Sequence, residues 1–519
     1  MKNTQLYLTF FVLISIGSCS IDEEPVFFSN QNLFDNAEGA NAVLNGVFTA
    51  ADNSLRNGFP QVVLSASGLL GINTLPFSTT IGSLAPLPSN TNLEQHWRES
   101  YATIGLANNF IAGLSTSDIG NQQEQDNMLG QAYFVRSWIY FNLVRIWGGV
   151  PLVIEPATLE NINQPRASIM DVYNQIIKDA ELAKNLLKDI GLQNLGRPAK
   201  PAASMLLAKV YITLAGDRRH SETDYWQKAY NEAIEVYGKY SLLPDFGALW
   251  YEETGDNTAE SVFELQGNIT YGAASNWEKL FSGVGSNAGR TADGKIWANL
   301  EVYDSHIKRY PSDPRIDYTF VTSFPIFNGQ GVQSTQTTYP LFTNRGNANR
   351  SYPKMFKYFV KDIHKINSTT NKNIIIYRYA DLLLMLAEIE NEINGPELAY
   401  QYVNQVLKRA RESSKDQGPS LSPEDWSNMT QAEFRASIMK EYQYELFGEG
   451  HEWFNVRRRG YDYFKASVID VHNNFPAYDF SRDYDNRYPE NDRIMLLPIP
   501  LSELATNSSL NLEDQNPGY

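Results

Sequence analysis

The sequence predicts a mostly α-helical protein in which paired helices pack against an irregular, loop-rich lobe with short strands. Apolar residues recur at three- and four-residue spacing over long stretches that end at glycine or proline. This helical period fades between about residues 255 and 373, where short apolar runs alternate with Gly, Asn, Ser and Thr. The 519 residues exceed the roughly 250–300 at which single cores stop growing, so two packed parts are expected.

The first 18 residues predict a secretory signal peptide. Lys2 gives a positive start, Leu6–Ile16 form an apolar run, and the small residues Gly17 and Ser18 follow. The run is shorter than the ~20 apolar residues that a membrane-spanning helix needs. We therefore expect a mature chain that does not cross a membrane.

Cys19 is the one cysteine of the chain, and the sequence around it indicates why it is there. Ile16 to Cys19 resemble a bacterial lipobox, in which cleavage leaves a lipid-bearing cysteine as the first residue. The alternative is an ordinary signal peptide with Cys19 left as a free thiol. With lipid on Cys19, the aperiodic, acidic residues 19–30 form a tether from the membrane.

Charge excludes some classes of partner. The formal net charge is -16, whereas nucleic acids and anionic lipids require clustered Lys and Arg. The dense basic run Arg457–Arg459 is too short to reverse this. Aromatic residues are plentiful, with 30 Tyr, 26 Phe and 9 Trp.

Helical periodicity begins at residues 36–50, and a Gly-, Pro- and Ser-rich loop is expected at 68–92. Helix pairs follow from Leu93 onward. In the clearest pair, a helix over 125–147 stops at Gly148, and its partner over 168–187 begins with a capping box of Ser168 and Asp171. The other expected helices cover 201–216, 225–237, 375–394 and 397–411. Small and large residues alternate on these helices, as in tetratricopeptide-type repeats.

These patterns predict one domain over residues 31–519 after the signal peptide and tether. Its curved scaffold of helix pairs occupies about 31–250 and 374–460, and the irregular lobe about 255–373. Residues 461–519 form a C-terminal segment.

Motifs for catalysis or metal binding do not emerge. The six histidines show no HExxH pattern, and no serine lies in a G-x-S-x-G elbow. Residues 283–288 match a loose GxGxxA without a following helix, and Asp479, Asp483 and Asp485 lack the glycine and glutamate of an EF-hand. We predict no metal site, no cofactor and no enzyme activity.

Six separated segments, in order along the chain, resemble the SusD/RagB family of Bacteroidota surface lipoproteins. They are GQAYFVRSWIYFNLVRIWGGVPLV (130–153), RPAKPAASMLLAKVYITLAG (197–216), IIIYRYADLLLMLAEIENEIN (374–394), EYQYELFGEGHEWFNVRRRG (441–460), LLPIPLSEL (496–504) and QNPGY (515–519). Tyr442, Glu452 and Asn455 depart from the family pattern.

The fourth segment has a structural interpretation. Glu441, Glu445 and Glu449 recur at helical spacing, and we expect them to pair with Arg457 and Arg458. Beneath them we expect the aromatic residues Trp453 and Phe454 to pack.

The resemblance implies a non-catalytic cell-surface protein, lipid-anchored in the outer membrane, that captures an oligosaccharide and caps a SusC-like TonB-dependent transporter. Two alternatives keep the complex but replace the glycan by a peptide or leave the protein as an adaptor without its own ligand. A surface hydrolase is disfavoured by the missing motifs.

Candidate ligand-binding residues follow from the chemistry of sugars, whose apolar faces stack on exposed aromatic rings. The aromatic candidates are Phe77 in the early loop and Tyr271, Trp277, Trp297 and Tyr339 in the lobe. The polar candidates beside them are Asn73, Asn276, Arg290 and Asn299. Trp97 and Trp250 lie on apolar faces and are expected in the core.

Overall fold

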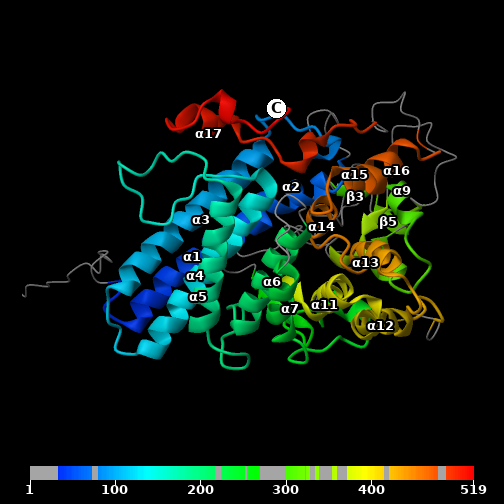
Figure 1. Ribbon diagram of the computed structural model, residues 1–519, viewed down its shortest axis with the longest axis horizontal. Helices are drawn as coiled ribbons and strands as arrows, with labels where there is room; N and C mark the ends of the chain where they lie inside the picture. Colours follow the sequence, from blue (N-terminus) through cyan, green and yellow to red (C-terminus); the bar gives the residue numbers. More distant parts are fainter. Residues whose placement is uncertain are drawn as a thin grey trace, which may run out of the picture.

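The protein is described by a computed structural model that covers residues 33–72, 80–216, 224–251, 254–268, 300–321, 323–327, 333–337, 353–358, 371–413, 420–476, 478 and 487–519. Helices dominate these residues (Figure 1). The longer helices are α1 (Ala37–Arg56), α2 (Gly58–Ala66), α3 (Thr91–Ser115), α4 (Gln122–Trp147), α5 (Ile169–Leu186), α6 (Lys200–Gly216), α7 (Tyr225–Ile234), α11 (Tyr379–Asn394), α12 (Pro396–Glu412) and α13 (Gln431–Glu445). The short ones are α9 (Asp304–Ile307), α10 (Ile316–Thr319), α14 (Glu452–Arg457), α15 (Tyr461–Phe464), α16 (Asp470–Asn473) and α17 (Leu501–Thr506).

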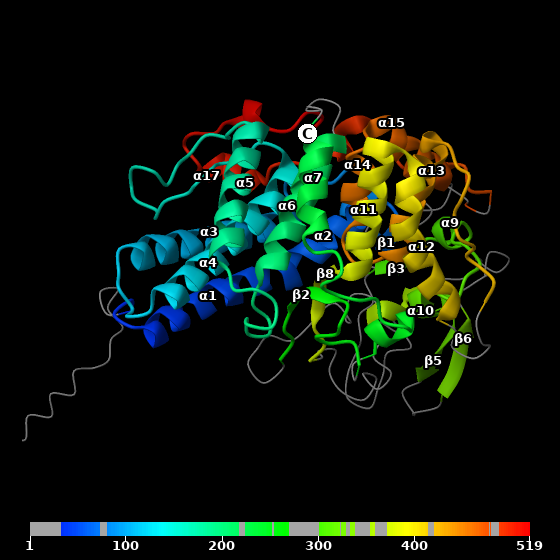
Figure 2. The same cartoon turned by 60° about the horizontal axis from the view of Figure 1, so that its bottom comes forward.

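Neighbouring helices in the chain pack side by side, which confirms the predicted scaffold of helix pairs. The pairs α4–α5, α6–α7 and α11–α12 are in extensive contact, and α5 also packs on α6. Helix α11 contacts α6, α7 and α13 and so joins the early helices to the late ones. The helices follow one another across the molecule from α1, α3 and α4 to α11, α12 and α13 (Figure 2).

The capping signals place the helix ends close to the predicted ones. Ser168 Oγ accepts the backbone N–H of Asp171 at 3.1 Å and starts α5. Helix α4 ends where Gly148 takes a φ of +76°, a conformation that side chains with a Cβ rarely adopt.

Two expectations about helix positions were wrong. The predicted helix from residue 375 begins only at Tyr379, because Ile374–Arg378 form strand β8, a β-branched run that pairs with another strand. The predicted loop at 68–92 contains strand β1 (Leu70–Ile72) and already the start of α3. Helix α2 was not predicted, since it is buried on nearly all sides and shows no polar face.

The lobe contains short strands, as predicted. They are β2 (Ser261–Leu265), β3 (Leu300–Val302), β4 (Phe320–Val321), β5 (Ser323–Phe327), β6 (Gln333–Thr337) and β7 (Lys354–Met355), and they are joined by β1 and β8 from outside the lobe. In the described part of the chain they form four antiparallel two-stranded ladders, β1–β3, β2–β8, β4–β7 and β5–β6. Ladders this small are marginal alone, so their positions depend on what they pack against.

The C-terminal segment closes over the end of α4. Trp147 is fully buried, and its Nε1 donates to the carbonyl of Pro498 at 2.9 Å. The side-chain amide of Asn516 donates to the carbonyls of Trp147 and Leu497 at 3.0 and 2.7 Å. Arg166 donates to the amide oxygen of Asn516 at 2.8 Å, so every polar group of this amide is used.

The partners expected for Glu441, Glu445 and Glu449 were wrong. The chain turns through positive φ at Gly448 and Gly450 between α13 and α14, which separates these glutamates from the basic run. Arg458 instead holds Glu388 of α11 with two bonds of 2.6 and 2.5 Å. Arg457 donates to the carbonyl of Met495. Trp453 and Phe454 are buried as expected.

The glutamates belong to a buried charge network that joins the lobe to the helices. Its carboxylates are Glu260, Asp313, Glu441, Glu445 and Glu449, and its cations are Arg315, Lys357, Arg378 and Arg409. All nine side chains are at most 4% exposed.

Glu445 of α13 is the centre of this network. It accepts bonds from Arg378 at 2.7 Å, from Arg315 at 2.9 Å, and from Arg409. Burial raises the pKa of Glu445, but these three guanidinium groups overcome that effect and hold the pKa below its ordinary value. Paired carboxylates of this kind stabilise structure and are not free to exchange protons.

We predict that Arg378→Met lowers the free energy of unfolding by about 3–5 kcal/mol, because it leaves buried carboxylates without their shared cation. Urea denaturation followed by circular dichroism measures the change. Lys408→Met is the control, since its pair with Glu412 is exposed at 65% and 52% and contributes about 1 kcal/mol or less. Equal stability of the two variants would contradict the role of the network.

Candidate functional site

The residues predicted to bind ligand lie outside the described part of the chain. These are Asn73, Phe77, Tyr271, Asn276, Trp277, Arg290, Trp297, Asn299 and Tyr339, and Cys19 also falls outside it. The described residues nevertheless show where the segments that carry them begin and end.

Two of these segments meet at one end of the β1–β3 ladder. Strand β1 leads into residues 73–79, and strand β3 follows residues 269–299. Ile72 is paired with Leu300, and the strands are antiparallel. The chain therefore enters one segment and leaves the other at the same end of the ladder.

The segment 338–352 joins the same frame. The backbone N–H of Val302 in β3 donates to the carbonyl of Pro353, directly after this segment, at 2.9 Å. Lys354 and Met355 then pair with Val321 and Phe320. Three segments with candidate residues are thus anchored on one small group of strands.

Aromatic packing fixes this frame on the C-terminal helices. The Tyr488 hydroxyl donates to the carbonyl of Gly68 at 3.1 Å, and the backbone N–H of Tyr303 donates to that of Leu69 at 3.1 Å. The ring of His472 stacks on Tyr488 at 4.0 Å and meets Tyr303 edge-on at 4.7 Å. These contacts support the ladder from the side of α16.

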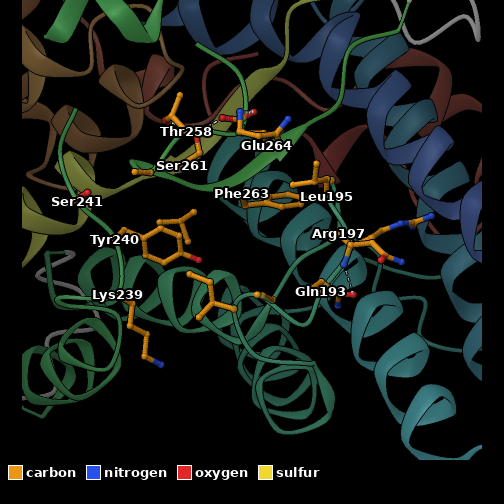
Figure 3. A pocket seen from close by; sticks show the side chains of 18 of the residues that line it. Gln193, Leu195, Arg197, Lys239, Tyr240, Ser241, Thr258, Ser261, Phe263 and Glu264 are labelled. Atoms are coloured by element: carbon orange, nitrogen blue, oxygen red, sulfur yellow. Dashed lines mark hydrogen bonds between the residues drawn. The ribbon is translucent and has the colours of Figure 1, made fainter. Parts of the chain in front are cut away.

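A pocket of about 500 Å³ lies beside strand β2 (Figure 3). Three stretches line it: residues 190–199 between α5 and α6, residues 238–241 after α7, and residues 257–264. Strand β2 continues toward residue 269, where the segment with Tyr271 and Trp277 begins. The last residue of the lining, Glu264, thus lies a few residues before a predicted binding segment in the chain.

The pocket offers one aromatic ring with a free hydroxyl among amide and hydroxyl groups. The Tyr240 side chain lies between Lys239 and Ser261 in Figure 3, and among the described residues its hydroxyl has no hydrogen-bond partner. Burial raises the pKa of Tyr240, so the hydroxyl stays protonated and can donate. Asn194 and Leu195 lie at its rim, and Leu195 is 75% exposed.

Two other polar side chains of the pocket already have partners. Gln193 donates to Asn127 at 2.8 Å, and Arg197 bonds Asn45 while its guanidinium lies 4.0 Å from the Phe48 ring centroid. The arrangement suits a ligand that stacks on one ring and accepts or donates a few hydrogen bonds. Sequence reasoning missed this pocket, although the apolar residues of the Gly-rich stretch 190–196 are a signal for an exposed loop with contacts of its own.

Residues expected in the core are found there. Trp97 and Trp250 are 5% and 3% exposed. Burial lowers the pKa of His96 to about 4 and that of His306 to about 3, so these rings are neutral packing residues. Among the residues that the structure describes, no group of three His, Cys, Asp or Glu side chains could hold a metal ion.

The described helices do not have the features of a transmembrane helix. None of them combines the length and the apolar character that a transmembrane span requires.

A model of the SusD family matches residues 218–519, more than half of the chain. The chain belongs to the SusD family. A second family model, described as starch-binding and associating with the outer membrane, matches residues 78–212. The predicted resemblance is confirmed.

Individual SusD-like relatives agree with the assignment. SusD-like protein P2 of Formosa agariphila is 28% identical over 549 residues, with both chains covered completely. A SusD-like protein of Bacteroides ovatus is 31% identical over 183 residues, which cover 34% of this chain and 33% of the other.

Solved structures of SusD proteins share the fold. A SusD homologue from Bacteroides thetaiotaomicron has a TM-score of 0.77 at 22% identity, covering 96% of this chain and 100% of its own. A laminarin-binding SusD-like protein has a TM-score of 0.69 at 21% identity, with 94% and 100% covered. Surface glycan-binding protein A from Bacteroides thetaiotaomicron, in complex with laminarihexaose, has a TM-score of 0.66 at 20% identity, with 91% and 98% covered.

Glu452 is a buried carboxylate at the start of α14, where the family pattern has a basic residue. It is 3% exposed, its Oε1 accepts the backbone N–H of Gly448, and its Oε2 has no hydrogen-bond partner among the described residues. Burial raises the pKa of Glu452 from 4.5 to about 7. The folded state therefore favours the protonated acid, and the stability that this group contributes is complete below pH 4.5 and lost as the pH rises through 7.

We predict that Glu452→Gln changes the pH dependence of stability. The variant should match the parent protein at pH 4.5 and exceed its free energy of unfolding by about 2–3 kcal/mol at pH 8, because the amide needs no deprotonation. Urea denaturation at both pH values measures this difference. Glu513→Gln, at an exposed glutamate, is the control. A difference that does not vary with pH would contradict the prediction.

Proposed function

We propose that this protein is a non-catalytic glycan-binding protein of the cell surface that captures an oligo- or polysaccharide for import. The observation that carries the proposal is membership of the SusD family, together with similar folds whose names state binding of laminarin or surface glycan. In this proposal the protein acts with a SusC-like TonB-dependent transporter in the outer membrane and caps it.

The proposed capture site combines the predicted aromatic residues with the frame that anchors them. Phe77 and Trp297 lie on segments that start and end at the paired residues Ile72 and Leu300, which supports one shared site. The pocket around Tyr240 extends the site along β2. The remaining proposed ligand residues are Asn73, Tyr271, Asn276, Trp277, Arg290 and Tyr339.

The absence of catalysis is part of the proposal. Its support is the state of the buried carboxylates that lie close together in the described residues, since the carboxylates around Glu445 are neutralised by arginine and lysine. Groups held in this way stabilise the fold and do not provide the free acid and base that glycoside hydrolysis needs.

The proposed attachment to the membrane rests on the N-terminal sequence. In this proposal residues 1–18 are removed, Cys19 carries lipid, and residues 19–30 connect it to the domain of residues 31–519. Several acyl chains on one cysteine would hold the protein at the outer membrane, where its transporter partner lies.

We predict that residues 20–519 bind one class of glycan, and that Trp277→Ala or Trp297→Ala weakens this binding by at least ~10-fold through the loss of ring stacking. Calorimetry with plant, host and microbial polysaccharides and a peptide digest measures this, with an assay for reducing ends alongside. Trp97→Phe, at a buried tryptophan, is the matched control. Binding to peptides but to no glycan would show that the ligand is a peptide. Capture of the transporter without binding of any glycan or peptide would favour an adaptor.

We predict that Cys19→Ala releases the protein from the outer membrane, because the thiol that carries the lipid is gone. Fractionation after metabolic labelling with a palmitate analogue measures both attachment and acylation. Replacement of the neighbouring Ser20 by alanine should leave both unchanged. Retained label in Cys19→Ala would contradict lipidation at this residue.

A further inference from the structure

A second pocket, of about 390 Å³, lies where the C-terminal ends of α4 and α6 meet α14, α15 and the C-terminal segment. In Figure 2, α14, α15 and the end of the chain lie along the upper edge, whereas strands β2, β8, β5 and β6 lie below. The residues that line this pocket come from none of the strands β1, β2 and β3 that anchor the proposed capture site. Its main lining residues are Arg145, Tyr173, Phe454, Arg457, Tyr461 and Arg493.

Arginine dominates this pocket, although the chain as a whole carries a net charge of -16. The lining contains five arginines, which are Arg145, Arg457, Arg458, Arg459 and Arg493. Among the described residues that line it, the carboxylates are represented by Asp492 alone, which is exposed. The residues that line the pocket are therefore mainly positive, whereas the protein as a whole is negative.

Two of the five arginines already have carboxylate partners behind the pocket. Arg458 is held by Glu388, and Arg459 reaches Glu388 at 2.9 Å and Glu392 at 3.4 Å. The side chains of Arg458 and Arg459 therefore form part of the wall of the pocket. Of the other arginines, Arg145 and Arg493 form no ion pair with any described residue.

Arg145 is a buried cation that forms no ion pair with a described residue, and the carboxylate whose charge acts on it, Asp381, pairs with Lys209 at 2.6 Å. The Nε of Arg145 donates to the carbonyl of Phe141 at 3.1 Å, its Nη2 donates to Asn142 at 2.5 Å, and it is 9% exposed. Its guanidinium lies between the rings of Phe141 and Phe454, at 3.9 and 3.7 Å from their centroids. No carboxylate of the described residues pairs with it, and its Nη1 has no acceptor among them. Burial lowers the pKa of Arg145 to about 9, as expected for a desolvated charge.

Arg493 adds a second guanidinium from another part of the chain. It lies on the turn Asp492–Met495, 5.5 Å from the ring centroid of Tyr519, and its Nη atoms have no hydrogen-bond acceptor among the described residues. Arg457 holds the neighbouring turn through the carbonyl of Met495 at 2.7 Å. Guanidinium groups in this number suit a planar or tetrahedral oxyanion, which accepts several charge-assisted bonds at once.

We infer that this pocket binds the acidic group of a saccharide, a uronate carboxylate or a sulfate ester, between Arg145 and Arg493. The inference rests on the proposed function for the nature of the ligand and assigns it a second, charge-selective site. The partly exposed Tyr461 provides apolar surface for the sugar ring beside the charged group. A free inorganic anion would use the arginines but not this ring.

Calorimetry on residues 20–519 tests the inference with galacturonic acid, galactose 6-sulfate, galactose and sodium sulfate as probes. We expect the two acidic sugars to bind at least ~10-fold more tightly than galactose, and added salt to weaken them. Sodium sulfate should bind more weakly than galactose 6-sulfate. Equal binding of galactose and the acidic sugars, or of sodium sulfate and galactose 6-sulfate, would overturn the assignment.

Three variants locate the site. Arg493→Gln should reduce the binding of acidic sugars at least ~10-fold, and Asp492→Asn should strengthen it, because the lining loses its exposed carboxylate. Arg487→Gln, which makes the same charge change at an exposed residue paired with Glu490, should have no effect. Unchanged binding in Arg493→Gln would overturn the inference.

The same variants separate this inference from the proposed function. Arg493→Gln should leave the binding of a neutral polysaccharide unchanged, and Trp297→Ala should leave the binding of acidic sugars unchanged. Neutral glycan binding without a preference for acidic sugars would refute only the second site. Acidic sugar binding that is lost in Trp297→Ala and kept in Arg493→Gln would place the acid at the capture site and refute the second site as well.

Discussion

The buried charge network around Glu445 is the interaction on which the arrangement of the two parts depends. Removing charges from water is costly, and the cost is recovered only when each charge meets partners in good geometry. Here the partners come from both sides, with Arg315 and Lys357 from the lobe and Arg378 and Arg409 from β8 and α12. The lobe cannot move away from the helices without leaving carboxylates buried and unpaired.

This coupling explains how short strands hold a fixed position. A ladder of two or three residue pairs has little stability of its own, and β1–β3 is that small. The ladder is held because Tyr488 and Tyr303 bond the backbone before β1, while the network fixes the turn that carries Arg315. Rigid helices thus position the strands at which the segments with the predicted ligand residues begin and end.

Local signals in the sequence predicted most helices. Strand pairs and ion pairs between residues far apart in the chain could not be predicted from it. Capping at Ser168 and the glycine stop at Gly148 are set by neighbouring residues, so they can be read without a structure. The sequence pattern predicts a helix from residue 375, where the structure has the strand Ile374–Arg378. This strand forms because it pairs with β2, more than a hundred residues away. Glu445 was assigned to nearby arginines for the same reason, although its partners are 36 to 130 residues distant.

The candidate site was predictable only in part. Aromatic content and loop composition pointed to segments such as 269–299, and these remain predictions because they lie outside the described residues. The pockets around Tyr240 and Arg145 could not be predicted, since each gathers residues from elements far apart in the chain. The sequence shows Arg145 as an ordinary helix residue, and only the structure shows that it is buried without an ion pair to any described residue.

The contacts of Asn516 have a consequence for the order in which the chain can fold. Synthesis proceeds from the N-terminus, so the helices up to α4 are made long before residue 516. Until that residue arrives, the carbonyl of Trp147 lacks the amide that covers it, and the indole lacks Pro498. The packing around Trp147 is therefore complete only when Pro498 and Asn516 are in place. A chain without these residues would leave this part of the core open to proteases and chaperones.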